Sequence, residues 1–368
     1  MVSESSASIR TPVRREIQGL RAIAIIAVVI YHSWPGLAPG GQVGVDVFFV
    51  VSGFLITGML VREAAASGTI SVPRFYLRRA TRLLPSAIIV LAFCVVMSAW
   101  VCPRDEQRQF LAEIVGSALY SQNWMQLLGD GSTTPMQHFW SLAVEEQFYL
   151  IWPALVLLAI VLARRFSSDN TKALALVLGV VTALSFAYCV WQTGQDHAVA
   201  YYSTFARAWE FGVGGLLALA PASAWMLRPQ LRAALSWAGL AVILGSVLVA
   251  ADQETFPGAV AAIPVLGTAA VIVAGTTGIA WAPDRILEWA PVQWLGGISY
   301  ALYLWHWPLL AFAPYVTGVP SESWFMVILL AAAVVLAWAT TRWIELPIRT
   351  AARISRTAPI PAGALARH

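Results

Sequence analysis

The sequence predicts an all-α polytopic membrane protein, because it is strongly apolar and carries few charges. Its 368 residues are 59% hydrophobic and 11% charged, whereas soluble domains carry about 25% charged residues. The mean hydropathy is +0.70, and apolar segments of about 20 residues, the length of a helix that crosses a bilayer, recur along the chain. These observations exclude a water-soluble globule and also a disordered chain, which requires low hydrophobicity.

Ten apolar segments are predicted to cross the membrane as helices. Each is close to the length that spans the hydrocarbon core of a bilayer. In chain order they are residues 20–36, 45–61, 83–102, 140–163, 173–192, 201–220, 235–251, 259–280, 294–315 and 324–343.

One further segment, 109–128, is only partly apolar, and the distribution of positive charge decides whether it crosses. If it does not cross, every Lys and Arg except Arg104, Arg108 and Arg207 lies on one side of the membrane. Cytoplasmic loops of membrane proteins carry such an excess of positive residues. We therefore expect about ten transmembrane helices, both termini in the cytoplasm, and an amphipathic or re-entrant segment at 109–128 on the outer face.

The chain is predicted to form one transmembrane domain over residues 1–350, located in the plasma (inner) membrane, with a basic cytoplasmic tail over 351–368. Its formal net charge of +4 does not indicate nucleic-acid binding, because the positive residues lie in short loops between apolar segments. Three cysteines (Cys94, Cys102 and Cys189) form no CxxC pair, so we expect packing residues and no metal site.

Several ionisable side chains are predicted to lie in the outer half of the membrane, where they are costly and often mark a functional site. These residues are His32, Asp46, Glu145, Glu146, Arg207, Glu210 and His306. Their similar depth on distant segments favours a common site. Structural interpretations remain open, with His32 as a hydrogen-bonded packing residue and with Arg207 and Glu210, at i and i+3, mainly as a structural ion pair.

Arginines lie at the inner ends of two of the predicted crossings. Arg21 and His32 are eleven residues apart, so they fall within about 20° of one helix face and about 16 Å apart along the axis. Both are therefore expected to face one cavity, although Arg21 can also be an ordinary interfacial anchor. Arg78 and Arg82, at i and i+4 before the third crossing, can set topology, bind phosphates, or do both.

With these residues identified, the sequence resembles the acyltransferase 3 family of integral membrane acyltransferases over roughly residues 14–350. Seven segments occur in the order typical of the family. They are REIQGLRAIAIIAVVIYH with its Arg-x10-His spacing, GQVGVDVFFVVSGFLIT, FYLRRATRLLP, HFWSLAVEEQFYLIWP, ARAWEFGVGGLLAL, ISYALYLWHWPLL and WIELPIR. The resemblance implies transfer of an acyl group, most often acetyl, from cytoplasmic acyl-CoA to a hydroxyl of an extracytoplasmic glycan or glycolipid.

The resemblance also implies roles for individual residues. His32 matches the candidate base, and Glu145 matches the acid of its motif. Independently of the resemblance, we expect Glu145 or Asp46 to orient His32. The phosphates of acetyl-CoA would bind to cofactor-binding residues Arg21, Arg78 and Arg82. Contacts with the substrate are expected from Tyr149, Arg207, Glu210, Trp305 and His306.

The segment ARAWEFGVGGLLAL resembles the branch of the family that often carries an SGNH-type esterase domain. Because the sequence contains no such serine motif, we expect either a stand-alone membrane domain or a chain truncated before that domain. The expected partners are membrane lipid, acyl-CoA, the glycan acceptor and an SGNH-type domain or protein, with no metal and no nucleic acid.

Two mechanisms and two other function classes remain open from the sequence, and one of these classes is a membrane partner or sensor without turnover. Acyl transfer can be direct, with His32 as general base, or can proceed through a covalent intermediate. A proton-coupled transporter or flippase of a cell-envelope precursor would also place His, Glu and Arg inside the membrane. The absence of recognisable inverted repeats in the sequence speaks against the transporter.

Overall fold

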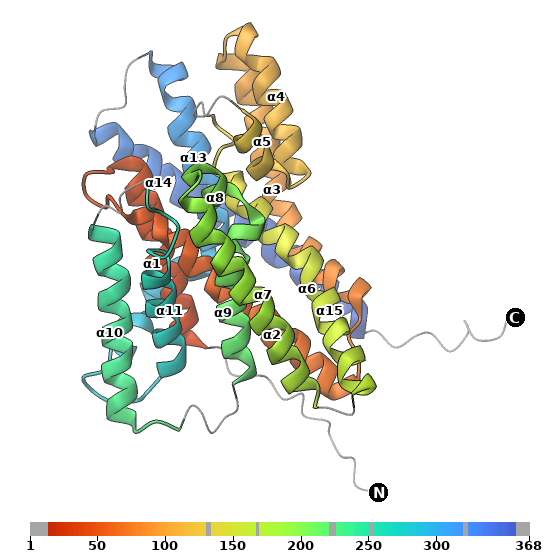
Figure 1. The fold of residues 1–368 in the computed structure, drawn as a ribbon. Coiled ribbons are helices and arrows are strands. Elements are labelled where there is room, and N and C mark those ends of the chain that lie inside the picture. Colours follow the sequence, from red (N-terminus) through yellow and green to blue (C-terminus); the bar gives the residue numbers. More distant parts are fainter. Residues whose placement is uncertain are drawn as a thin grey trace, which may run out of the picture.

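The computed structural model describes residues 14–129, 134–166, 169–220, 226–249, 254–318 and 323–357. Over these residues the chain is helical and forms no strand, which confirms the predicted fold class. The elements are α1 (Arg15–Ser33), η1 (Gly41–Val43), α2 (Gly44–Ser67), α3 (Val72–Val101), α4 (Arg104–Ala118), α5 (Gln122–Leu128), α6 (Phe139–Arg165), α7 (Asn170–Thr193), α8 (His197–Tyr202), α9 (Thr204–Leu219), α10 (Pro229–Leu248), α11 (Ala262–Ala274), α12 (Asp284–Leu287), α13 (Ala290–Thr317), α14 (Ser323–Thr340), η3 (Thr341–Glu345, a π-helix) and α15 (Leu346–Thr357). The long helices pack side by side as a bundle (Figure 1).

The multi-pass architecture agrees with the prediction. Seven helical stretches among the described residues are long and apolar enough to cross a membrane: α1, η1 with α2, α3, α6, α7, α10, and α14 with its continuation to Ala351. The other three predicted crossings correspond to α9, α11 and α13, of which α9 and α11 have only 16 and 13 residues. The total of ten crossings and the side of each terminus remain predictions, and residues 1–13 and 358–368 lie outside the described residues.

The segment 109–128 does not form one helix of spanning length. It consists of the end of α4 and of α5, separated by a sharp turn in which Tyr120 has a φ of 53°. The side chain of Asn123 donates hydrogen bonds to the Tyr202 carbonyl and to Thr204 Oγ1, both at 3.1 Å. Gln147 of α6 donates to the Tyr120 carbonyl at 2.8 Å. The polar groups of this segment are therefore satisfied by neighbouring helices, as a segment that stays near one face requires.

The bundle has two distinct ends, which we call outer and inner according to the side that the charge distribution predicts for each. The outer end carries α4, α5 and α8 (Figure 1), and the inner end carries α12 and the first residues of α1, α10 and α13. At the inner end, Arg232 donates to the Ala274 carbonyl at 2.6 Å and Gln293 donates to the Arg15 carbonyl at 2.8 Å. These bonds join α10 to α11 and α13 to α1 at that end.

Helices α2 and α9 approach each other closely because glycines face each other between them. A Cβ atom built on Gly53 of α2 would lie 2.0 Å from the Phe211 carbonyl oxygen, and one on Gly214 of α9 would lie 2.0 Å from the Val50 carbonyl oxygen. Small residues allow such contacts between membrane helices. Beside them the ring of Phe211 stacks on Phe49 and on Phe148, with centroids 4.4 and 4.1 Å apart. This close packing fixes the position of α2 relative to α9, and therefore also the positions of the polar side chains that the two helices carry.

Candidate active site

A cavity of about 510 Å³ opens at the outer end of the bundle. Its described lining is neutral apart from histidine, with no Lys, Arg, Asp or Glu. Aromatic rings and amides make most of the wall, namely Tyr31, Trp140, Tyr201, Tyr202, Phe256, Trp307, Gln42 and Gln137, with the histidines His32, His138 and His197. A cavity of this size and composition is suited to a small, uncharged, polar ligand.

His32 faces this cavity and forms a hydrogen bond with a second histidine. Its Nδ1 atom lies 3.0 Å from Nε2 of His306, which is fully buried in the middle of α13. The two rings are nearly parallel, with centroids 5.2 Å apart, and the ring of Trp307 lies 4.6 Å from His32. The expectation that Glu145 or Asp46 orients His32 is therefore wrong, because the ring partner is His306.

Glu145 lies in a different, central cavity of about 70 Å³. Its carboxylate accepts short hydrogen bonds from the hydroxyls of Ser52 and Tyr149. The same cavity is lined by the guanidinium groups of three arginines, Arg21, Arg79 and Arg82. The sequence analysis expected Glu145 to act beside His32 and Tyr149 to contact the substrate, whereas in the structure both residues line the cavity that contains the arginines.

A wall of hydrogen-bonded side chains separates the central cavity from the outer one. The hydroxyls of Ser141 and Tyr303, which line the central cavity, are 2.6 Å apart. The Tyr303 hydroxyl also donates to the carbonyl of His138 at 3.0 Å, and the His138 side chain lines the outer cavity. Arg21 and His32 consequently line different cavities and not the single one that their spacing predicted.

The inner end of the bundle contains a third cavity, of about 570 Å³, which shares Arg21 and Arg82 with the central cavity. Its other charged residues come from the far end of the chain. They are Arg342 and Glu345 of the π-helical turn η3 and Arg349 of α15, and Arg349 donates to Glu345 at 3.0 Å. Four arginines thus line one opening, with a single glutamate among them. π-helical turns occur frequently at functional sites.

Two of the predicted phosphate-binding arginines, Arg21 and Arg82, line these cavities, and one does not. Arg78 donates to the carboxylate of Glu63 at 2.6 Å and is absent from the lining of all three described cavities. The next residue, Arg79, lines the central cavity instead, with its guanidinium 5.3 Å from the Tyr149 ring. Sequence reasoning also missed Arg342 and Arg349, although their separation of seven residues places them on one helix face.

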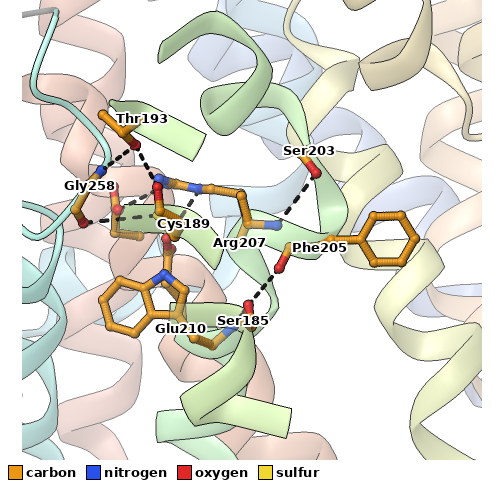
Figure 2. A network of polar contacts seen from close by, with 11 residues as sticks. Ser185, Cys189, Thr193, Ser203, Phe205, Arg207, Glu210 and Gly258 are labelled. Atoms are coloured by element: carbon orange, nitrogen blue, oxygen red, sulfur yellow. Dashed lines mark hydrogen bonds and ion pairs between the residues drawn. The ribbon is translucent and has the colours of Figure 1, made fainter. Parts of the chain in front are cut away.

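Asp46, Arg207 and Glu210 form a separate buried cluster between α2 and α9, and Figure 2 shows Arg207 and Glu210 within it. Nη2 of Arg207 lies 2.9 Å from Asp46 and Nε lies 3.1 Å from Glu210, and all three side chains have no exposed surface. The rings of Phe49, Tyr201 and Phe256 surround the guanidinium at 5.7–5.8 Å. The geometry favours the structural interpretation, because none of the three charged groups lines a described cavity.

Trp305 is also remote from the described cavities. Its Nε1 donates to Thr340 Oγ1 of α14 at 3.0 Å, and its ring packs against Phe93 of α3. The structure therefore places Trp305 in helix packing and does not bring it to His32. Within the described residues, no group of three His, Cys, Asp or Glu side chains is arranged to hold a metal ion, and all three cysteines are buried and unpaired.

Comparison with known proteins decides the family. The acyltransferase domain family matches residues 14–342 of the chain. The chain belongs to this family. The predicted resemblance is thereby confirmed, and six of the seven segments that carry it contribute residues to the lining of the described cavities.

Among relatives of this acyltransferase domain is the peptidoglycan O-acetyltransferase OatA of Listeria monocytogenes, 31% identical over 358 residues, covering 90% of this chain and 55% of the relative. The putative peptidoglycan O-acetyltransferase YrhL of Bacillus subtilis is 31% identical over 353 residues, which cover 91% of this chain and 54% of the relative. A putative O-acetyltransferase of Staphylococcus aureus is 31% identical over 354 residues, which cover 90% of this chain and 57% of the relative. The chain thus spans little more than half the length of these relatives. No solved structure matches it.

Proposed function

We propose that the chain is a membrane O-acetyltransferase that moves an acetyl group from cytoplasmic acetyl-CoA to a hydroxyl of an extracytoplasmic glycan. The proposal rests on the difference in charge and composition between the cavities at the two ends of the bundle. The inner cavity is lined by four arginines, and the outer cavity is neutral, aromatic and contains His32. The first suits a donor with several phosphates, and the second suits an uncharged sugar unit.

In this proposal the arginines of the inner and central cavities hold the donor. Arg21, Arg82, Arg342 and Arg349 bind the phosphates by charge-assisted hydrogen bonds. The pantetheine arm extends toward the central cavity, where Arg79 and Glu145 line the path. Tyr149 and Ser52 keep the carboxylate of Glu145 in place by donating hydrogen bonds to it.

The transfer itself takes place at the wall between the central and outer cavities. His32 removes the proton from the acceptor hydroxyl as its oxygen attacks the thioester carbonyl, in the manner of a general base. A carbon–oxygen bond forms, the carbon–sulfur bond breaks, and the proton held by His32 passes to the leaving thiolate. Transfer in two steps through an acylated side chain would use the same cavities in succession.

The test is acetyl transfer by the chain in membranes. Vesicles that contain the wild-type chain or His32→Gln are given acetyl-labelled acetyl-CoA and peptidoglycan fragments, and free coenzyme A and base-labile acetate on the glycan are measured. We expect both products from the wild type and a reduction of about 10²- to 10⁴-fold with His32→Gln, because a general base contributes that factor. A transporter would move its cargo without releasing coenzyme A, and equal rates from both forms would remove His32 from the chemistry.

A further inference from the structure

The two ring nitrogens of His306 have different partners, and these partners fix where its proton lies. Nδ1 is 2.6 Å from the carbonyl oxygen of Tyr303 and 3.2 Å from that of Leu302. A carbonyl oxygen only accepts hydrogen bonds, so Nδ1 of His306 must carry a hydrogen atom. In a neutral imidazole the other nitrogen, Nε2, then has a free lone pair. The backbone of α13 thus determines the tautomer of its own histidine.

The proton position on His306 dictates the one on His32. Nε2 of His306 has a lone pair and lies 3.0 Å from Nδ1 of His32, so Nδ1 of His32 must be the donor in that contact. Neither ring has a carboxylate partner within the described residues, so a positive charge on either ring would be unpaired. Such a charge is costly on the fully buried His306 and on the half-buried His32 that stacks against it, so both rings are neutral at rest. His32 therefore has its lone pair on Nε2, an atom with no hydrogen-bond partner among the described residues.

The sequence that follows His306 explains why the ring of His138, as well as that of His32, lies against this part of α13. Pro308 follows two residues after His306 and has no backbone N–H, so the carbonyl of Leu304 loses its helical hydrogen bond. His138 occupies that position, with its Nε2 atom 3.2 Å from the Leu304 carbonyl oxygen. Pro308 thus leaves an acceptor free for His138, the residue that precedes α6, close to the place where His32 of α1 contacts His306.

We propose that His306 is a positioning residue, which holds His32 in the tautomer whose Nε2 atom accepts the proton of the acceptor hydroxyl. This inference rests on the proposed function and names the atom and the partner on which it depends. When Nε2 takes the proton, the bond from Nδ1 to His306 is retained and becomes charge-assisted. His306 replaces the carboxylate that orients the histidine in hydrolase triads, and so Glu145 and Asp46 can serve elsewhere.

Two substitutions at His306 separate positioning from packing. His306→Leu removes the acceptor for Nδ1 of His32, whereas His306→Gln supplies an amide oxygen close to the position of Nε2. We expect His306→Leu to lower the turnover number by about 10²-fold or more, with little change in the KM for acetyl-CoA, because the donor is held at the other end. His306→Gln should keep turnover well above that of His306→Leu.

Trp305→Phe is the matched control, because it removes a buried hydrogen bond to Thr340 on the same helix without contact with His32. We expect it to leave turnover per folded protein close to that of the wild type. If Trp305→Phe lowers turnover as much as His306→Leu does, or if His306→Gln is as inactive as His306→Leu, the positioning role is wrong and His306 acts through packing.

The tautomer can be measured without reference to activity. The chain has five histidines, so nitrogen NMR of histidine-labelled protein in lipid nanodiscs can be assigned by single substitutions. We expect His32 in the wild type to carry its hydrogen on Nδ1, and His306→Leu to shift this population toward the other tautomer. A wild-type His32 protonated on Nε2 would overturn the inference. The expected tautomer together with no acetyl transfer from the wild type would leave the hydrogen-bond chain standing and overturn the proposed function.

Discussion

Among the arginines in the first turns of α3, the contacts of each side chain separate a role in binding from a role in structure. Arg78 is paired with Glu63 of α2, and Arg82 lines both the central and the inner cavity. The sequence identified a basic cluster and the shared face of these two residues. It could not identify Glu63 as the partner of Arg78, because that pairing depends on how α2 and α3 pack.

This difference predicts unequal effects on donor binding. Arg82→Ala should raise the KM for acetyl-CoA by about 10- to 100-fold, since a hydrogen bond to a charged group contributes about 1.5–3 kcal/mol. Arg78→Ala is the matched control and should change that KM much less. The measurement is coenzyme A release at varied acetyl-CoA concentration. A larger effect from Arg78→Ala would favour the assignment made from the motif alone.

Asp46 illustrates how a residue with the right chemistry and depth can have another partner. The sequence placed it near the outer end beside His32, and its carboxylate instead binds Arg207. A carboxylate is more strongly attracted to a fully buried guanidinium than to a neutral imidazole. Only the contact between α2 and α9 brings that guanidinium within reach, and their sequence separation of about 160 residues conceals it.

At the scale of elements, α2 and α9 depend on their glycines for this contact. Gly53→Ala would force a methyl group to within 2.0 Å of the Phe211 carbonyl oxygen. The methyl carbon is attached directly to one helix backbone and the carbonyl oxygen is part of the other, so neither can move aside alone and the helices must separate. We therefore expect a loss of about 1–3 kcal/mol in the free energy of unfolding. We expect a lower midpoint of thermal unfolding in detergent. We also expect a smaller fraction of the protein to elute from gel filtration at the position of the folded form.

Gly179→Ala is the control for this prediction, because a Cβ atom at Gly179 in α7 meets nothing within 4 Å. It should be neutral or stabilising by about 0.5–1 kcal/mol, since glycine is unfavourable inside a helix. Equal destabilisation by both substitutions would show that close packing of α2 and α9 is not the cause.

Helix α13 shows what a single element contributes to the site. Its sequence YLWHWP places His306 against His32, Trp305 in the packing with Thr340, and Pro308 where a carbonyl becomes available to His138. The sequence predicted a crossing here and a role for both Trp305 and His306. Adjacent residues on a helix point about 100° apart, so only the packing of α13 decides which of the two reaches His32.

At the scale of the whole molecule, the arginine-lined cavity and the histidine-lined cavity lie at opposite ends of the bundle. A donor on one side and an acceptor on the other require that the loops alternate across the membrane. The loop after α2, with exposed Thr69, and the loop after α7, with exposed Gln195, should therefore face opposite sides.

Cysteine labelling tests this sidedness directly. The three native cysteines are buried, so a membrane-impermeant maleimide should label intact cells that carry Gln195→Cys and leave Thr69→Cys unlabelled. Permeabilised cells should label at both positions, which controls for local accessibility. Labelling of Thr69→Cys in intact cells would contradict the orientation predicted from the positive charges.

The sequence by itself determined the helical membrane architecture, the positions of most crossings, the family, and the residue types of the site. These properties follow from hydrophobic length, charge distribution and local motifs, which the chain carries in linear order. The tertiary structure alone decided that His32 pairs with His306, that Glu145 joins the arginines, and that Arg342 and Arg349 complete the inner cavity. The residues that meet in this way come from distant parts of the chain, as Arg21 and Arg349 do at the inner cavity, and their meeting depends on which helix faces pack together.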